Sequence, residues 1–397
     1  MDFNPIILSI PIYFILITIE WVYDILKKKH RYRLGDAYAN IGCGIFEQVT
    51  GVFAKVFTVG LFTIVYEQFR ITTIPVNGFT IFLLWILIDF CYYWAHRWSH
   101  EINFFWIGHV VHHQSEDYNL SVALRQGALQ KFFTAPVYLP LAVAGFSPKW
   151  FLFIGALNTV YQFWIHTESI KKMGWFEYVF NTPSHHRVHH GKNPKYIDKN
   201  HAGSLIIWDK LFGTFQKEEE HPTYGITKSV KTFNPILAHV KAIADLVTDV
   251  KSQKGVNKFK ALFYSPGWVE RKKEQHLDKV KFQFSLNKKM STYFFIQAML
   301  LLIFTAYFLF QFTFMNANNQ AIATTFILFN LFSLGWFYES KKHAKVVEVM
   351  KWVPFVIFAF IMNNELLWPA TIISLISISH LYYCTNSKTS PIENKAV

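Results

Sequence analysis

Histidine is concentrated in one block of the sequence, which runs from Asp89 to Phe215. The block contains three clusters, HRWSH at 96–100, HVVHH at 109–113 and SHHRVHH at 184–190, and a single histidine in WIHTE at 164–168. Residues three or four positions apart share one face of a helix, so each cluster can direct two or three imidazoles at one point. Neutral imidazole is a ligand for zinc, iron, copper and nickel, and the spacing therefore indicates a metal centre.

The candidate ligands outnumber those that one metal ion uses. They are His96, His100, His109, His112, His113, His166, His186, His189 and His190. One ion commonly takes three or four protein ligands, so this set indicates two ions. A single histidine is more often a surface or hydrogen-bonded side chain, but clustered imidazoles beside apolar segments are costly unless they are paired or ligated.

The composition indicates that a membrane protein holds these clusters. Of the 397 residues, 52% are hydrophobic and 16% are charged, whereas a soluble protein carries about 25% charged residues. The net charge of +13 fits Lys- and Arg-rich loops that face anionic lipid, and we expect no nucleic acid partner. The three cysteines are far apart and form no CxxC pair, so they indicate neither a disulfide framework nor a thiolate metal site.

Apolar segments flank the histidine block on both sides. A span needs roughly 20 residues, and we expect spans or parts of spans at 5–26, 51–66, 78–95, 292–315, 321–338, 352–363 and 365–383. Segments 132–144 and 150–165, joined by a turn with Gly145 and Pro148, predict a helical hairpin that returns to the face it left. The predicted fold class is all-α, a multi-span integral membrane protein with a histidine-rich site for two metal ions.

Basic residues set the expected orientation. Five of them directly follow the first span, namely Lys27, Lys28, Lys29, Arg31 and Arg33. This excess favours the cytoplasm for the basic cluster and the outside for the N-terminus. Alternating spans then bring the histidine clusters to the cytoplasmic side, either of a bacterial inner membrane or of the endoplasmic reticulum membrane.

The chain divides into four expected parts. These are N-terminal spans at 1–76, a catalytic domain at 77–290, C-terminal spans at 291–384 and a disordered tail at 385–397. Within the catalytic domain, Asn234 and Pro235 predict the start of a helix with an apolar stripe. Two interpretations remain open for that helix, which either lies on the membrane surface or packs on the catalytic domain.

Five stretches of the histidine block carry a resemblance to a known family. They are DFCYYWAHRWSHE, HVVHHQSEDYNLSVALRQ, YQFWIHTE, NTPSHHRVHHGKNPKYIDKN and AGSLIIWDKLFGTF. The sequence resembles the fatty acid hydroxylase/sterol desaturase superfamily over about residues 78–268, and within it the alkylglycerol monooxygenases. The resemblance implies a non-haem monooxygenase in which the candidate histidines bind two iron ions, O2 is the co-substrate and tetrahydrobiopterin is the reductant.

The reaction that the resemblance implies is hydroxylation of the ether carbon of an alkylglycerol lipid, which gives a fatty aldehyde and a free glycerol hydroxyl. The expected partners are the lipid substrate, the membrane and a system that regenerates the reductant. A sterol desaturase or lipid C-hydroxylase with another electron donor is the alternative, because it would keep the same ligands. A haem-binding electron carrier and a transporter or metal channel fit less well, since HxxHH triplets do not suit axial haem ligation and the clusters begin where spans end.

Three further residues are candidate catalytic groups. Glu101 and Glu168 lie one and two residues after a candidate ligand, and carboxylates commonly accept the second N–H of a ligating histidine. Each is as often an ordinary charge at a helix end. His185 is adjacent to a candidate ligand but off its helix face, which suits a supporting or substrate-side group. His201 stands where the family usually has Tyr, and a local substitution is favoured there over a tenth ligand.

Overall fold

The computed structural model describes residues 5–269, 280–362 and 364–386, and within these residues it contains helices and no strand. The predicted all-α class is therefore confirmed for the part of the chain described. The chain divides into two compact units. The first comprises Met1–Val230 and Lys241–Asp278, and the second comprises Lys231–Val240 and Lys279–Val397.

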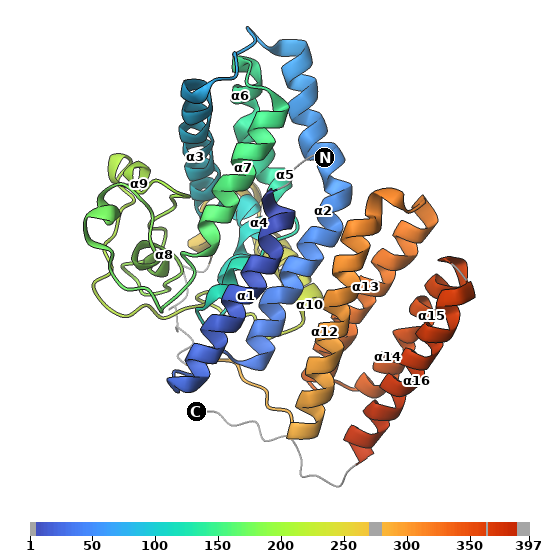
Figure 1. Cartoon of the computed structure of the whole chain (residues 1–397). Coiled ribbons are helices and arrows are strands. Elements are labelled where there is room, and N and C mark those ends of the chain that lie inside the picture. Colours follow the sequence, from blue (N-terminus) through green and yellow to red (C-terminus); the bar gives the residue numbers. More distant parts are fainter. Residues whose placement is uncertain (1–4, 270–279, 363, 387–397) are drawn as a thin grey trace. The chain divides into compact units, whose positions relative to one another are not determined.

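The first unit carries the whole histidine block. Its elements are α1 (Pro5–Leu26), α2 (Leu34–Phe69), α3 (Gly78–Glu101), α4 (Asn103–His113), η1 (Leu120–Leu124), α5 (Gln130–Thr134), η2 (Ala135–Tyr138), α6 (Leu139–Ala144), α7 (Pro148–Phe163), η3 (Gly174–Tyr178), α8 (Pro183–His189), α9 (Ile207–Leu211), α11 (Asn257–Phe263) and η4 (Pro266–Trp268). Helix α7 packs against α1 and α3, and α6 packs against α2 (Figure 1). These long helices form the frame from which the histidines project.

Five of the described helices are long and apolar enough to cross a membrane. They are Ser9–Leu26 within α1, Leu34–Phe69, Gly78–Glu101, Lys288–Phe314 and Ala317–Tyr338. Helix α2 begins well before the predicted span at 51–66. Its first part contains the buried polar residues Asp36, Asn40 and Glu47, which interrupt the apolar pattern, so the pattern covered only the second part of the helix. Helix α3 likewise continues past residue 95, and its last two turns therefore carry both His96 and His100.

The predicted hairpin is present, and its tip lies against the loop between α2 and α3. Its first arm consists of α5, η2 and α6, and its second arm is α7. The Ile71 N–H donates to the Val143 carbonyl at 2.8 Å, and the Ile74 N–H donates to the Gly145 carbonyl at 3.1 Å. Gly145 has φ +101°, and a Cβ there would lie 1.9 Å from the Thr72 carbonyl oxygen, so the turn requires glycine. The tip therefore lies at the end of α3 opposite to His96.

The second unit is a helical bundle with one buried ion pair. It contains α12 (Lys288–Gln311), η6 (Phe312–Phe314), α13 (Ala317–Tyr338), α14 (Ala344–Met350), α15 (Trp352–Met362) and α16 (Asn364–Asn386). Glu348 accepts hydrogen bonds from the Tyr293 hydroxyl at 2.8 Å and from Lys351, and both charged side chains are fully buried. The partners around Glu348 satisfy its charge in an apolar bundle.

Helix α10 (Pro235–Lys251) begins in the second unit and continues into the first. Its predicted start at Asn234 and Pro235 is confirmed, because the Asn234 side-chain oxygen accepts the Ile236 N–H at 3.1 Å. Of the predicted tail, residues 385 and 386 complete α16, and residues 387–397 lie outside the described residues.

Candidate metal centre

The candidate ligands come from the ends of four helices. His96 and His100 lie in the last two turns of α3, and α4 starts almost at once after it, since Ile102 flanks both helices. The HVVHH cluster forms the last turns of α4, and the third cluster forms α8 and its C-terminal flank. His166 follows the end of α7. The candidate ligands on α3, α4, α7 and α8 thus all lie at or just after the C-terminal ends of their helices, and all of them are buried.

The structure brings all of these imidazoles together in two groups. The five-histidine group is His96, His100, His109, His113 and His189. The four-histidine group is His112, His166, His186 and His190. Within each group the ligand nitrogens lie within 4.8 Å of one another, and every member is buried. Each group offers at least as many nitrogens as one ion commonly takes from a protein.

Helix geometry explains why each HxxHH cluster serves both groups. Successive residues of an α-helix lie about 100° apart around its axis, so positions i and i+4 differ by about 40° while i+3 and i+4 differ by about 100°. In the α4 cluster, His109 and His113 join the five-histidine group and His112 joins the other. In the α8 cluster, His186 and His190 join the four-histidine group and His189 joins the other. Each cluster thereby bridges the two candidate ion positions.

Backbone carbonyls orient four of the rings. The His96 Nδ1–H donates to the His201 carbonyl at 2.8 Å, and the His189 Nδ1–H donates to the Lys199 carbonyl at 2.9 Å. In the other group, His112 donates to the Arg125 carbonyl at 2.7 Å and His166 to the Gln162 carbonyl at 2.8 Å. A carbonyl oxygen can only accept, so each of these neutral rings carries its proton on Nδ1 and a lone pair on Nε2.

These tautomers make the site fit a cation. The Nε2 atoms of His112 and His166 lie 3.3 Å apart although neither carries a proton to share. The Nε2 of His189 is buried and has no hydrogen-bond partner. Nitrogens that bind one ion at about 2.1 Å lie about 3.0–3.4 Å apart in octahedral or tetrahedral geometry. The facing lone pairs therefore suit a metal ion in each group.

Burial keeps the rings in the form that binds metal. It lowers the pKa of His112 to about 4, helped by the neighbouring His100. Burial followed by the charge of neighbouring histidines lowers the pKa of His186, His189 and His190 well below the ordinary value of 6.5. At neutral pH these imidazoles are uncharged, so no proton has to leave before a metal binds.

The loop that orients His96 and His189 is itself fixed by side chains. Asn200 has φ +57°, and its side chain donates to the carbonyls of His185 and Gln216 at 3.0 Å and 2.7 Å. Asp209 accepts the backbone N–H groups of His201 and Ala202 at 2.7 Å and 2.8 Å. Sequence reasoning missed this loop as part of the site, because its contribution is made by backbone carbonyls.

The His201 ring lies beside the five-histidine group but outside it. The ring is fully buried, and its centroid lies 5.0 Å from that of His100 and 5.7 Å from those of His96 and His189. The Asp198 backbone lies close to the ring, but neither ring nitrogen makes a hydrogen bond of ordinary geometry. His201 thus lies next to the five-histidine group without belonging to it, and its interpretation as a local substitution stays a prediction.

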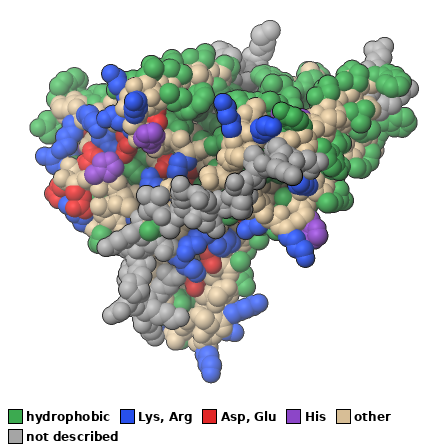
Figure 2. All heavy atoms as spheres, turned by 90° about the horizontal axis from the view of Figure 1, so that it is seen from below, with side chains coloured by type: hydrophobic (Ala, Val, Ile, Leu, Met, Phe, Trp, Pro, Cys, Tyr) green, Lys and Arg blue, Asp and Glu red, His purple; other side chains and the backbone are tan. Residues whose placement is uncertain are grey.

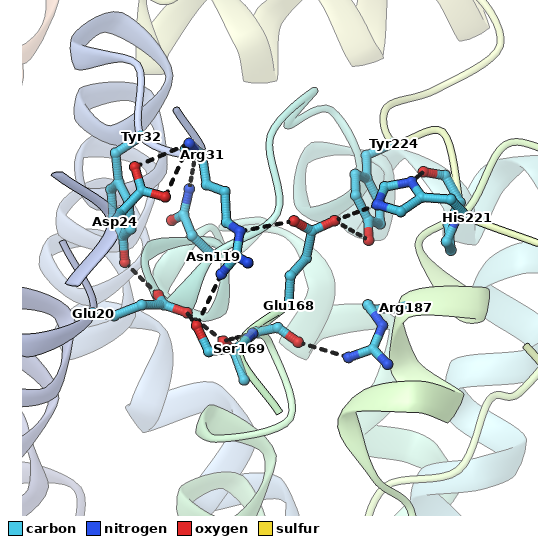
Figure 3. Close-up of polar contacts among 12 residues, drawn as sticks. Glu20, Asp24, Arg31, Tyr32, Asn119, Glu168, Ser169, Arg187, His221 and Tyr224 are labelled. Carbon is cyan, nitrogen blue, oxygen red and sulfur yellow. Dashed lines mark hydrogen bonds and ion pairs between the residues drawn. The ribbon is translucent and has the colours of Figure 1, made fainter. Parts of the chain in front are cut away.

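Each of the two candidate catalytic carboxylates pairs with side chains outside the two histidine groups. Glu101 accepts a hydrogen bond from Arg97 at 2.8 Å at the end of α3, where its side chain is 39% exposed. Glu168 accepts the Tyr224 hydroxyl at 2.9 Å and pairs with Arg31 and His221, each at 3.1 Å (Figure 3). Backbone carbonyls, not these two carboxylates, accept from the four ligand rings described above, and the His100 Nδ1 lies 3.6 Å from the Asp198 carboxylate.

Figure 3 shows that Glu168 lies between Arg31 on one side and Tyr224 and His221 on the other. It ties the Arg31 segment, which connects α1 and α2, to the chain that follows His166. Its partner Tyr224 stacks on Tyr118 with ring centroids 4.7 Å apart, and Tyr118 lies 5.2 Å from His190. The rings of Tyr224 and Tyr118 therefore connect Glu168 to His190 in the four-histidine group.

His185 lies outside both groups. Its ring meets Phe215 edge-on at 5.4 Å, and its backbone carbonyl accepts from Asn200. Burial lowers the pKa of His185 to about 4, against the opposing charge of Glu177. Its position on α8 directs it away from the ligands, which suits the supporting role rather than metal binding.

Figure 2 shows Lys, Arg, Asp, Glu and His side chains as well as apolar side chains on the surface that it presents. The surface side chains near the centre include His221 together with an exposed cluster in which Lys195 pairs with Glu219 and Glu220. The helices that carry the ligands are apolar along their length. The metal centre therefore lies where apolar helices end and a polar region begins.

Comparisons with known proteins agree with this geometry. The fatty acid hydroxylase family matches residues 81–214, which contain all of the candidate ligands. Alkylglycerol monooxygenase from Homo sapiens is 36% identical over 87% of this chain and 80% of its own length, and that from Xenopus tropicalis is 33% identical over 85% and 78%. An ornithine lipid hydroxylase from Rhizobium tropici is 30% identical over 41% of the chain and 50% of its own length. No solved structure matches the chain.

The site and the helical frame thus define a membrane oxidoreductase with a fatty acid hydroxylase domain. The similarity to the alkylglycerol monooxygenases identifies a narrower family, because it covers most of this chain and most of the length of each relative. The chain belongs to the alkylglycerol monooxygenase family.

Proposed function

We propose that the protein is a membrane-bound di-iron monooxygenase that hydroxylates the ether carbon of alkylglycerol lipids. The observation that carries the proposal is the set of buried imidazoles divided into a five-histidine and a four-histidine group. Membership of the family supports the monooxygenase reaction and the choice of iron. Imidazole alone also accepts zinc, copper and nickel.

The reaction balances with one molecule of O2, two electrons and two protons. One oxygen atom becomes the hydroxyl on the carbon beside the ether oxygen, and the other leaves as water. The resulting hemiacetal then collapses, which breaks the carbon–oxygen bond and gives a fatty aldehyde and a free glycerol hydroxyl. When bound, the two iron ions supply the activation of O2 that side chains cannot provide.

The protein's own residues prepare the site for this chemistry. Carbonyls of Arg125, Gln162, Lys199 and His201 hold the Nδ1 protons of four rings, which fixes the Nε2 lone pairs toward the ion positions. All of the ligand rings are buried, which keeps bulk water away from a reactive oxidant.

We also propose tetrahydrobiopterin as the electron donor, a cytoplasmic site and a partner system that regenerates the reductant. The donor follows from the family. The cytoplasmic side follows from Lys27, Lys28 and Lys29 directly after the first span, together with the exposed charged cluster near the centre. A soluble pterin can reach a site on that side. The membrane itself is either the bacterial inner membrane or that of the endoplasmic reticulum.

The test is aldehyde release from 1-O-hexadecylglycerol by purified, iron-loaded protein, with and without tetrahydrobiopterin. Metal content is measured on the same sample. We expect pterin-dependent aldehyde and about two irons per chain. Two metals with no aldehyde under any donor would leave the histidine site in place and refute the proposed reaction.

A lipid C-hydroxylase with another donor is the second candidate function. The similarity to an ornithine lipid hydroxylase over 164 residues favours it, because that segment shows that related domains act on other lipids. A stable hydroxylated lipid, formed without aldehyde and with a donor other than a pterin, would decide for it.

A further inference from the structure

A cavity of about 80 Å³ lies between α3 and α7, within the helical frame of the first unit. Its lining includes Ile88, Tyr92, Tyr138, Gly155, Thr159 and Gln162. None of these residues belongs to either histidine group, and the cavity is not explained by the metal site alone. We refer to it as the α3–α7 slot.

The residues that line the slot follow one another along two helices. On α7 its lining residues Phe151, Gly155, Thr159 and Gln162 follow one another at intervals of three or four positions and so share one helix face. From Phe151 to Gln162 the helix rises about 16 Å, at about 1.5 Å per residue. On α3, Ile88 and Tyr92 are likewise one turn apart. A cavity whose lining follows two helices in this way suits a linear chain better than a compact ligand.

Two residues that line the slot are next to candidate ligands. Tyr92 is one turn before His96, and the two ring centroids are 5.3 Å apart. The carbonyl of Gln162 accepts the Nδ1–H of His166 at 2.8 Å. His96 belongs to the five-histidine group and His166 to the four-histidine group. The slot therefore approaches both candidate ion positions from the side of the apolar helices.

Polarity changes along the slot. Near the histidines, the Gln162 side chain donates to the Asn158 side-chain oxygen at 2.8 Å, and Asn158 donates to Asp89 at 2.9 Å. Further from the histidines, the lining is formed by Ile88 and Phe151. Thr159 is exposed on the outer surface of α7 and Gly155 is half-buried, so the slot opens sideways between helices. Such an opening is accessible to a molecule that lies in the bilayer.

We propose that the α3–α7 slot binds the alkyl chain of the lipid substrate, with the ether carbon at the Tyr92 and Gln162 end. The proposal rests on the proposed function, because the chain is that of an ether lipid. The polar end accommodates the ether and glycerol oxygens, and the apolar end accommodates the hydrocarbon. Gly155 then sets the width of the slot along the chain.

Gly155 allows the proposal to be tested without disturbing the fold. A Cβ built on Gly155 meets no atom within 4 Å, so a larger side chain there extends into open space. Gly155 lies seven residues before Gln162, about 10 Å along the helix. An extended chain advances about 1.2 Å per bond, by analogy with a peptide that spans about 3.6 Å in three bonds, so about eight carbons reach this level. Shorter chains end before Gly155, and longer chains pass it.

The experiment compares Gly155→Leu with Gly60→Leu, in the iron-loaded protein, on 1-O-octylglycerol and 1-O-hexadecylglycerol. Gly60 is the matched control, because it lies in the apolar helix α2, a Cβ there also meets nothing within 4 Å, and it does not line the slot. We expect Gly155→Leu to lower kcat/KM at least tenfold for the hexadecyl substrate and less than threefold for the octyl substrate. Gly60→Leu should change neither, and both variants should keep the metal content of the wild type.

Equal losses for the two chain lengths in Gly155→Leu, or no loss for either, would overturn the slot. Gly155→Ala serves as a second variant in case the leucine impairs folding, and it should show the same selectivity with a smaller amplitude. A binding measurement separates the slot from the proposed reaction. An alkylglycerol with a diazirine at the chain end should label peptides of α3 and α7 in the wild type and lose that labelling in Gly155→Leu.

Labelling of α3 and α7 in a protein that forms no aldehyde would refute the reaction and retain the slot. Conversely, aldehyde formation with labelling elsewhere and no selectivity in Gly155→Leu would retain the reaction and refute the slot.

Discussion

The Nε2 atoms of His112 and His166 lie 3.3 Å apart, although each ring donates its only proton to a backbone carbonyl. Two lone pairs that face each other inside a protein repel unless a cation lies between them. The residues are 54 positions apart in the sequence, and they come from the end of α4 and the chain after α7. The fold therefore brings distant segments together at the expense of an unfavourable contact that a metal would relieve.

The first prediction concerns His112. Replacing it with Ala removes one of the four imidazoles of the four-histidine group, so we expect that group to bind its ion more weakly and the metal content after purification to fall below two ions per chain. Activity should fall more than a hundredfold, because loss of an outer partner alone commonly costs ten- to a hundredfold. Metal analysis and aldehyde release on the same preparation measure both effects. His189→Ala should act in the same way on the other ion.

His185→Ala is the matched control for these variants. It removes a buried histidine from the same helix as His189, but one outside both groups. We expect wild-type metal content in this variant. Two ions retained in His112→Ala, or metal lost to the same degree in His185→Ala, would contradict the assignment of the groups.

The second prediction concerns Asn200, whose loop supplies two of the orienting carbonyls. Its side chain makes hydrogen bonds with the His185 and Gln216 carbonyls and with the Gln216 N–H. We expect Asn200→Ala to weaken metal binding at the five-histidine group ten- to a hundredfold, as loss of an outer partner commonly does. Competition with a chelator measures this change, and occupancy of the four-histidine group should not change.

Asn200→Gly distinguishes loss of the side-chain hydrogen bonds from strain in the backbone as the cause of weaker metal binding. Asn200 has φ +57°, which alanine adopts at a cost of roughly 1 kcal/mol and glycine adopts freely. If the hydrogen bonds hold the loop, both variants should weaken metal binding. A normal affinity in Asn200→Gly would show instead that backbone conformation alone decides.

Much of the site could be predicted from the sequence, because histidine spacing is a local property. The positions of His109, His112 and His113 on one helix define which rings are neighbours, and the apolar segments predict helices beside the clusters, although α2 and α3 extend beyond those segments. The partition into two groups also follows from helix angles, although the predictions extended only to the number of ions. By contrast, the role of the Lys199 and His201 carbonyls depends on the path of a loop, which side-chain spacing does not encode.

The predicted supporting carboxylates illustrate the same limit. Glu101 and Glu168 are close to ligands along the chain, but helix α3 turns the Glu101 side chain toward Arg97 and the loop after His166 turns Glu168 toward Arg31. The apolar pattern predicted a span only at 51–66, whereas helix α2 also contains the buried polar residues Asp36 and Asn40. Hydrogen-bond partners far along the chain make such residues compatible with a buried helix, and these partners cannot be identified from local patterns.

The third prediction concerns the stability of the metal-free protein at acidic pH. Burial lowers the pKa of His112 to about 4, whereas an unfolded chain has about 6.5. Between these values the unfolded state binds more protons, so the stability of the metal-free protein should be constant above pH 7 and fall as the pH decreases from about 6.5 to about 4. Each such histidine contributes on the order of 1–3 kcal/mol to the loss. Thermal melts of chelator-treated protein between pH 8 and 5 provide the measurement, and a flat profile would contradict it.

The fourth prediction distinguishes Glu168 from Glu101. The Glu168 and Arg31 side chains are each 14% exposed and each has further partners, so Glu168→Gln should destabilise the protein by about 1–3 kcal/mol. Glu101→Gln removes a pair on the surface of α3 and should cost no more than about 0.5 kcal/mol. Both variants should retain the wild-type metal content, because neither carboxylate contacts the orienting carbonyls. Denaturant melts and metal analysis test this, and metal loss with unchanged stability in Glu168→Gln would restore Glu168 as a direct partner of the ligands.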